Sequence, residues 1–374
     1  MIVYKQTDKV SADDLSKIIT LLTKNFPGDL EALKQRFTDE FSQDTDLEWL
    51  IAYHNNCIIG VLLLRPKIMN FLSAKLSVCG MSYMAIDAEF QRHEVAENLK
   101  KMVLETGDKY DLSLGFARKK MDGYWSPYNF VGISDFSETK IKTLDINLYD
   151  PEFSVQIEDA EIADLEAIEK IYTQNNYNLI GNFHRSLNEF EFAISTPNHR
   201  GCFKRFICAE VFCGYMIIQD EKVVEIRIKK GFYENCAFAL KKYFQHKSQK
   251  IISFKTHLND PFIRYISQFS HTTEMRYAYE GGHIIRISDL ESFFDKIAPV
   301  LAKRLSNFNF SDFEIENNLI HIHFTKGVLD IDIKDKLASK ELTKLAFGIV
   351  SSHEEIWHLI FGNLHTQFPT FDQF

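Results

Sequence analysis

Hydrophobic residues follow two spacings along the chain, and these spacings predict its helices and strands. The segment 11–26 carries apolar residues at helical intervals, and Ser11 lies three residues before Asp14, as at the start of a capped helix. The stretch 49–66 consists of two apolar runs around the letters HNN, which is typical of a hairpin. Further strands are expected at 76–86 and 110–117, with a helix between them at 93–106. This order predicts an α+β protein built around a mixed sheet.

A similar order of elements begins again after Pro151, which interrupts the patterned sequence. A helix is expected at 160–172 and an apolar hairpin at 206–219, and the letters CGYMIIQ in this hairpin echo CIIGVLLL in the first. From about residue 289 the pattern changes to an amphipathic helix, a hairpin and further helical segments. We therefore expect a duplicated unit followed by a smaller α+β unit, with the divisions 1–149, 150–287 and 288–374.

Composition and charge narrow the class of protein. The chain has 374 residues and a formal net charge of −9, which argues against nucleic-acid binding because a phosphate backbone needs a basic face. The N-terminus turns polar at once, and the longest apolar run, at 57–64, is too short to cross a bilayer. The six cysteines form no CxxC pair, which is typical of reduced thiols. A cytoplasmic protein without a membrane span is expected.

Two histidines near the C-terminus raise the question of a metal. His321 and His323 lie on one face of the hairpin at 319–335, with Asp330 and Asp332 on its other strand. No fourth ligand is evident from the spacing. We interpret both pairs as exposed polar positions of a half-buried hairpin, and we expect no metal.

The junction between the strand at 76–86 and the following helix is a candidate anion site. Free amides at a helix N-terminus, with the helix dipole behind them, suit a pyrophosphate group. Gln91, Arg92 and His93 supply further donors around this junction. Strand–turn–helix junctions with a few charges are common, so the purely structural interpretation stays open.

Two other residues could move protons. Tyr128 lies four residues before a glycine in a turn-rich segment, where its phenol either donates a proton to a leaving group or packs with its hydroxyl on a backbone partner. Phe374 ends the chain shortly after an apolar helical segment. If that end is tucked in, desolvation would raise the pKa of its α-carboxylate and make it an available general base.

Together these segments resemble the enhanced-intracellular-survival (Eis) type proteins, in which two fused GNAT acetyltransferase-like domains precede a sterol-carrier-like domain. The letters MSYMAIDAEFQRHEVAENL are similar to the acetyl-CoA strand and pyrophosphate loop of that family, and PYNFVG is similar to its catalytic tyrosine segment. KTHLNDPFIRY resembles the strand and helix of its second domain, and a C-terminal phenylalanine is common in the family. The resemblance covers essentially the whole chain, and it implies that the second GNAT-like domain is degenerate.

The resemblance implies transfer of an acetyl group from acetyl-CoA to a primary amine of an aminoglycoside, a polyamine or a lysine side chain. Tyr128 would protonate the departing thiolate, and the α-carboxylate of Phe374 would accept the proton of the attacking amine. The family also implies a homo-oligomer, commonly a hexamer. Acetyl-CoA would lie beside the strand and over the loop that follows it, at Met84, Ala85, Ile86, Gln91, Arg92, His93, Glu94, Val95 and Ala96.

One position departs from the family's loop pattern, Gln/Arg-x-x-Gly-x-Gly/Ala. Glu94 stands where the first glycine is expected, and it adds a side chain and a negative charge where glycine lets amides approach a phosphate. If its side chain points to solvent, the amides stay usable, and if it folds over them, the site is closed. Two hypotheses follow: an acetyltransferase with a weakened cofactor site, or a binding or scaffold protein that has lost acetyl-CoA.

Overall fold

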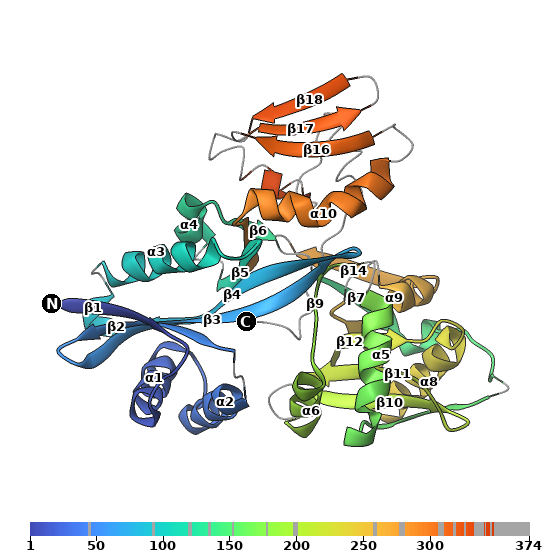
Figure 1. Ribbon diagram of the computed structural model, residues 1–374. Coiled ribbons are helices and arrows are strands. Elements are labelled where there is room, and N and C mark those ends of the chain that lie inside the picture. Colours follow the sequence, from blue (N-terminus) through green and yellow to red (C-terminus); the bar gives the residue numbers. More distant parts are fainter. Residues whose placement is uncertain are drawn as a thin grey trace.

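The computed structural model describes residues 1–43, 46–91, 94–118, 122–133, 136–151, 153–176, 179–196, 201–256, 260–276, 281–305, 310–316, 319–324, 327–332, 340, 342–344 and 346–347. Two large mixed sheets lie side by side, and a three-stranded sheet lies beyond the first of them (Figure 1). The α+β class with two mixed sheets, predicted from the sequence, is confirmed. None of the described helices is long and apolar enough to cross a membrane.

The first sheet has the order β1-β2-β3-β4-β5-β15-β6, and β9 pairs with β3 off this path. Apolar side chains of α1 (Ala12–Asn25) and α2 (Leu30–Gln43) form one core with the sheet, and those of α3 (Val95–Gly107) and α4 (Asp122–Trp125) form another. The strands are β1 (Ile2–Thr7), β2 (Glu48–His54), β3 (Cys57–Phe71), β4 (Ala74–Ile86), β5 (Leu112–Arg118), β6 (Val131–Ile133), β9 (Ile180–Phe183) and β15 (Gly281–Ile287).

The second sheet has the order β14-β7-β13-β12-β11-β10-β8. Its strands are β7 (Phe136–Lys142), β8 (Val155–Asp159), β10 (Cys202–Cys208), β11 (Val211–Gln219), β12 (Lys222–Ile228), β13 (Ile251–Phe254) and β14 (His271–Arg276). Its helices are α5 (Leu165–Asn176), α6 (Leu187–Ser195), α8 (Tyr233–His246) and α9 (Pro261–Ile266).

The two sheets exchange a strand. β7 follows β6 along the chain but lies between β13 and β14, and β15 follows β14 but lies between β5 and β6. In each sheet, the strand next to one edge therefore comes from the other half of the chain, whereas the edge strand itself, β6 or β14, comes from the same half as the rest of the path. The sheets therefore cross the domain boundaries expected after residues 149 and 287, because β7 ends before residue 149 and β15 ends at residue 287, yet each belongs to the sheet of the other half.

The hairpins β2–β3 and β10–β11 are built in the same way. Each turns on two residues with positive φ, Asn55–Asn56 at 49° and 63° and Ala209–Glu210 at 46° and 65°, as two-residue hairpin turns require. In each, the third residue of the second strand, Ile59 or Cys213, is an extra residue that forms a bulge. The echo between the two hairpin sequences therefore reflects a duplicated backbone.

The third unit is attached to the first sheet through α10 (Leu290–Leu305). Phe293, Phe294 and Ile297 of this helix pack in one core with Val78 of β4 and Leu114 of β5. In Figure 1, α10 lies between the first sheet and the small one. The small sheet pairs antiparallel strands, β16 (Phe310–Glu316), β17 (Leu319–Phe324) and β18 (Gly327–Asp332), so the hairpin predicted at 319–335 is present.

A buried carboxylate holds α10 in place. Asp111, whose side chain is fully buried, accepts hydrogen bonds from Lys296 at 2.6 and 2.8 Å and from the hydroxyl of Ser292 at 2.5 Å. The backbone N–H of Ser77 donates to it at 2.5 Å. Burial alone would raise the pKa of Asp111, but the hydrogen bonds from Lys296, Ser292 and Ser77 together hold it below its ordinary value.

We predict that Asp111→Asn lowers the free energy of unfolding by about 1–3 kcal/mol at neutral pH. Because the folded pKa of Asp111 is depressed, its contribution is complete above the ordinary carboxyl pKa and is lost as the pH falls through the folded value. Denaturant unfolding at pH 7 and at about pH 3 checks this, since the two proteins should differ less at the lower pH. Asp108→Asn, which removes a half-exposed pair with Arg286, is the control and should cost under about 1 kcal/mol. An equal loss in both variants would contradict the assignment.

Candidate functional site

An opening lies between β4 and β5 of the first sheet. The two strands are parallel and paired from Val78–Leu112 to Met81–Gly115. Beyond that last pair, β4 continues to Ile86 and β5 to Arg118 without pairing to each other. Met84, Ala85 and Ile86, singled out from the sequence, therefore lie on the part of β4 that is not paired with β5.

A bulge in β4 lies at this opening. Val61 pairs with Ala85 and Leu63 with Ser82, so that both Tyr83 and Met84 lie opposite a single residue of β3. Tyr83 has a φ of 49°, in the left-handed region that a side chain rarely adopts. A bulge interrupts the ladder, so backbone groups here are free of the regular pairing and can serve a ligand in the opening.

Side chains from β4 reach both faces of the sheet at the bulge. Met84 and Ile86 pack in the core beneath α3, whereas Tyr83 and Ala85 pack in the core beneath α1 and α2. The Tyr83 hydroxyl donates to the buried carboxylate of Glu40, at 2.9 and 3.1 Å to its two oxygens. This contact fixes the strained residue in place.

Helix α3 starts beside the same opening. Glu94 is its N-cap residue; its side chain is exposed and makes no capping hydrogen bond. The first amides of a helix have no acceptor within the helix, and the Glu94 side chain makes no hydrogen bond to those that begin at Val95, a residue that is itself buried. Of the two orientations expected for this side chain, its exposure matches the one that points to solvent. Gln91 is exposed and Ala96 half-buried, whereas Arg92 and His93 lie outside the described residues.

Tyr128 lies in the turn at Ser126–Tyr128, directly after α4, and its hydroxyl donates to the carboxylate of Glu97 in the first turn of α3. Lys100 is the second partner of Glu97, at 2.6 Å. The Lys100 side chain is only 3% exposed, and its ammonium lies 3.6 Å from the ring centroid of Tyr124 and 4.7 Å from that of Tyr128. The ammonium is thus held by one carboxylate and two aromatic faces.

These contacts set the proton affinity of the tyrosine. Hydrogen bonds from Lys100 and then Tyr128 hold the pKa of Glu97 below its ordinary value, so that Glu97 is ionised. The hydrogen bond to this carboxylate is the main cause that raises the pKa of Tyr128 to about 12. Tyr128 is therefore a protonated phenol whose hydrogen is directed at Glu97, and it must leave Glu97 before it can donate to another group.

Sequence reasoning singled out Tyr128 but not its partners Glu97, Lys100 and Tyr124. The spacing of Glu97 and Lys100, three residues apart, was the available signal, but burial of the lysine between two rings is visible only in the fold.

Phe374 lies outside the described residues. The third unit does approach the tyrosine turn, because Lys340 donates to the Ser126 hydroxyl at 2.6 Å.

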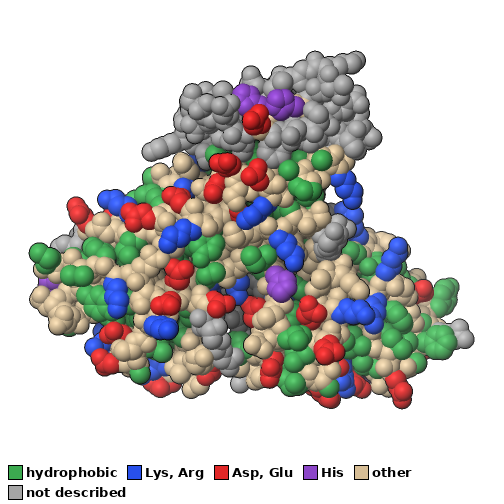
Figure 2. Space-filling view, viewed as in Figure 1, with side chains coloured by type: hydrophobic (Ala, Val, Ile, Leu, Met, Phe, Trp, Pro, Cys, Tyr) green, Lys and Arg blue, Asp and Glu red, His purple; other side chains and the backbone are tan. Residues whose placement is uncertain are grey.

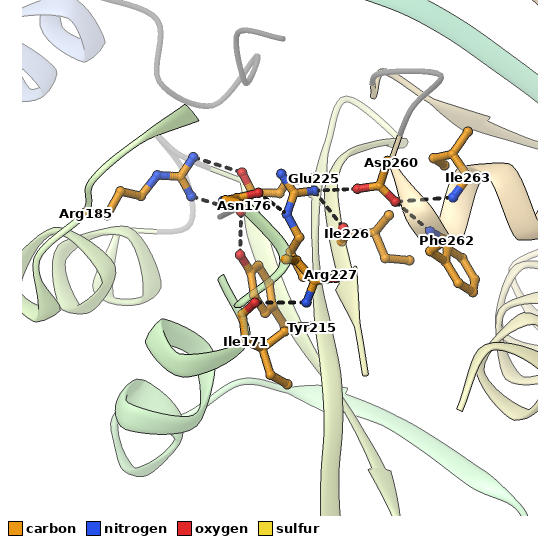
Figure 3. Close-up of polar contacts among 11 residues, drawn as sticks. Ile171, Asn176, Arg185, Tyr215, Glu225, Ile226, Arg227, Asp260, Phe262 and Ile263 are labelled. Carbon is orange, nitrogen blue, oxygen red and sulfur yellow. Dashed lines mark hydrogen bonds and ion pairs between the residues drawn. The ribbon is translucent and has the colours of Figure 1, made fainter. Parts of the chain in front are cut away.

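The second sheet has a corresponding opening. β12 and β13 are parallel and share the single ladder pair Val223–Phe254. Arg227, further along β12, forms an ion pair with Asp260 at 2.9 Å, and both side chains are at most 2% exposed. Asp260 also caps α9 by accepting from the amides of Phe262 and Ile263 (Figure 3).

More buried charges extend this network. Arg185 makes two hydrogen bonds to Glu225, at 2.8 and 2.9 Å, and the hydroxyl of Tyr215 donates to Glu225 at 2.6 Å (Figure 3). Arg227 shares one face of the sheet with its cross-strand partner Tyr215, whereas α9 packs with α8 in the other core. Within the described residues, the Arg227–Asp260 pair therefore joins β12 to the start of α9 beside the gap between β12 and β13.

Charges on the face of the molecule shown in Figure 2 are mixed, with acidic and basic side chains interspersed over the described part of the surface. No group of three or more His, Cys, Asp or Glu side chains within the described ranges is arranged to hold a metal ion.

Solved structures share this fold over nearly the whole chain. A probable N-acyltransferase from Enterococcus faecalis V583 is 15% identical, with a TM-score of 0.69 over 99% of this chain and 98% of its own. A GCN5-related N-acetyltransferase from Kribbella flavida is 11% identical, with a TM-score of 0.68 and complete coverage of both chains. Eis1 from Mycobacterium abscessus is 12% identical, with a TM-score of 0.62 and complete coverage of both chains.

No protein-family model matches the sequence, and no curated protein does. The likeness to the solved structures shows that the chain has the fold of the GCN5-related N-acetyltransferases, as the resemblance to Eis-type proteins implied. The sterol-carrier-like character of the third unit stays a prediction.

We predict that Glu97→Gln lowers the pKa of Tyr128 from about 12 toward the ordinary tyrosine value, because a neutral amide no longer opposes the phenolate. NMR of protein labelled at tyrosine Cζ, titrated from pH 8 upward and assigned with Tyr128→Phe, measures it. Tyr110 is the internal control, since burial and then Glu48 raise its pKa to about 12 and neither is altered. A Tyr128 signal that titrates unchanged in the variant would refute the role given to Glu97.

Proposed function

We propose that this protein is an acyl-CoA-dependent N-acetyltransferase that acts on primary amines, with its site at the opening between β4 and β5. One observation carries the proposal: the strands stop pairing after Met81–Gly115, at a bulge and beside an uncapped helix N-terminus. This arrangement occurs in a chain that has the fold of GCN5-related N-acetyltransferases over its full length. The matching position in the second sheet carries buried ion pairs.

Acetyl-CoA fits the groups at this opening. Its pantetheine arm carries amide groups that can pair with the backbone at the bulge of Tyr83 and Met84, and its pyrophosphate suits the free amides that begin at Val95. Glu94 opposes the pyrophosphate, but its side chain is exposed, so a penalty of about 1–2 kcal/mol is expected from screened repulsion. Bound there, acetyl-CoA would supply the acetyl thioester.

The chain's own groups would then handle the protons. The amine must be neutral to attack, and the α-carboxylate of Phe374 is proposed as the base that accepts its proton. Tyr128 is proposed as the acid that protonates the departing thiolate, after its hydroxyl turns away from Glu97. Lys100 would stay paired with Glu97 and keep that carboxylate ionised. Acceptors of the proposed class are aminoglycosides, polyamines and lysine side chains.

The alternative is a scaffold or binding protein that keeps the fold without acetyl-CoA. Two carboxylates, Glu94 at the N-cap of α3 and Glu97 in its first turn, lie where a pyrophosphate would bind, and Glu97 already accepts a hydrogen bond from the Tyr128 hydroxyl. The amides to which Glu94 makes no hydrogen bond and the end of β4 that is not paired with β5 favour the enzyme, since a scaffold needs neither.

We predict that acetyl-CoA binds the protein with a micromolar dissociation constant and that Glu94→Gly binds it about five- to thirtyfold more tightly, as removal of about 1–2 kcal/mol of repulsion requires. Isothermal titration calorimetry with an unmodified C-terminus measures both. Glu105→Gly, far along the same helix, is the matched control for loss of a charge. If neither the wild type nor the Glu94 variant binds, the proposal fails and the scaffold alternative stands.

We also predict that residues added after Phe374 abolish acetyl transfer, because a peptide bond removes the α-carboxylate. The measurement compares thiol release from acetyl-CoA, with spermidine or kanamycin as acceptor, between an N-terminally and a C-terminally extended protein. Binding of acetyl-CoA should be equal in the two proteins, which controls for misfolding. Full turnover by the C-terminally extended protein would exclude the terminus as the base.

A further inference from the structure

Ser82 stands out at the opening because its hydroxyl has no hydrogen-bond partner among the described residues. The residue is 6% exposed and its Oγ is inaccessible to solvent. Buried hydroxyls are nearly always paired, since burial without a partner forfeits the hydrogen bond to water. Other buried hydroxyls of these sheets follow the rule: the Ser113 hydroxyl bonds to that of Ser288 at 2.7 Å, and the Ser253 hydroxyl donates to Glu138 at 2.5 Å.

The position of Ser82 in the ladder places it at the mouth of the opening. The last pair of β4 with β5 is Met81–Gly115, so Ser82 is the first residue of β4 beyond that pairing. It is also the last residue paired to β3 before the bulge of Tyr83 and Met84. The hydroxyl thus lies where the two strands separate and where the backbone departs from the ladder.

The direction of the side chain follows from register. Ser82 lies opposite Leu63, and directly opposed residues in an antiparallel pair share a face of the sheet. Leu63 packs in the core beneath α1 and α2, whereas Met81 packs beneath α3. Ser82 is therefore on the face opposite α3, across the sheet from the helix N-terminus that suits the pyrophosphate.

We infer that the Ser82 hydroxyl is a hydrogen-bond donor to the carbonyl oxygen of the acyl thioester. This inference rests on the proposed function and adds a residue to it. A ligand whose anionic end lies at α3 and whose chain passes between β4 and β5 presents its acyl end where the two strands separate, beside Ser82. The burial of the hydroxyl makes such a donor effective, because no water competes for it.

The role in the reaction is electrostatic. As the neutral amine attacks, the C–N bond forms and the π electron pair of the carbonyl moves onto its oxygen. Ser82 keeps its proton and donates a stronger hydrogen bond to that developing negative charge. When the carbonyl re-forms, the C–S bond breaks with its electron pair on sulfur, and the thiolate takes its proton from another group, for which Tyr128 is proposed.

The test compares two ligands and three variants. S-ethyl-CoA has the shape of acetyl-CoA with a methylene group in place of the carbonyl, so the ratio of their dissociation constants isolates the carbonyl contact. We expect calorimetry to show that wild type prefers acetyl-CoA by about two- to tenfold, the range of one net hydrogen bond. Ser82→Ala and Ser82→Cys, which lack a strong donor, should lose that preference. Ser113→Ala should keep it.

Thermal unfolding without ligand gives the second readout. Because the Ser82 hydroxyl has no hydrogen-bond partner in the described part of the chain, Ser82→Ala should have a Tm at least equal to that of wild type. Ser113→Ala, which breaks the bond to Ser288, should have a lower Tm. A Ser82→Ala protein that unfolds at a lower temperature, as Ser113→Ala does, or that keeps the preference for acetyl-CoA, overturns the inference and leaves the proposed function intact. If wild type binds neither ligand, the proposed function fails and takes this inference with it.

Discussion

The exchange of β7 and β15 between the sheets is the constraint on which the rest of the molecule depends. β15 pairs with β5 on one side and with β6 on the other, so the strand that follows the Tyr128 turn is held in the sheet by residues 283–285. The proton donor proposed for the first unit is thus positioned by a strand that follows the second. Neither unit can complete its sheet alone, and the long sequence separation of these contacts makes assembly of the two halves a joint event.

The opening between β4 and β5 and the corresponding one between β12 and β13 differ in the side chains that line them. In the second sheet Arg227 of β12 pairs with Asp260, which precedes α9, and Glu225 of β12 pairs with Arg185, so two arginines and two carboxylates balance in charge beside the gap. Breaking one partner of such a network leaves a buried, uncompensated charge, which destabilises the fold. In the first sheet the matching face carries Ser82 and Tyr83, and no charged pair joins β4 to β5 among the described residues. At matching positions of the duplicated backbone, one copy therefore carries buried ion pairs and the other carries a serine and a tyrosine.

The charges around the start of α3 explain how the proposed cofactor site could tolerate Glu94 where the family's loop pattern has glycine. Glu97 is neutralised locally by Lys100, whose ammonium is enclosed by Tyr124 and Tyr128. Glu94 is left in solvent, where screening weakens its effect. Both carboxylates would repel a pyrophosphate. Glu97, however, holds Lys100 and Tyr128 in place, and Glu94 adds only a small, screened repulsion. This distribution makes a weakened cofactor site compatible with an intact tyrosine.

The sequence by itself determined the local elements and their duplication, because periodicity, capping residues and two-residue turns act over a few residues. The hairpins at Asn55–Asn56 and Ala209–Glu210 and the strand–helix junction at 76–106 were predicted on that basis. Only the tertiary structure decided which sheet β7 and β15 join, since strand pairing depends on contacts far apart in the chain. It also decided that the Glu94 side chain is exposed, that Glu97 and Lys100 hold Tyr128, and that the buried Ser82 hydroxyl has no partner among the residues that the structure describes. Each of these depends on packing between elements, which no spacing along the chain records.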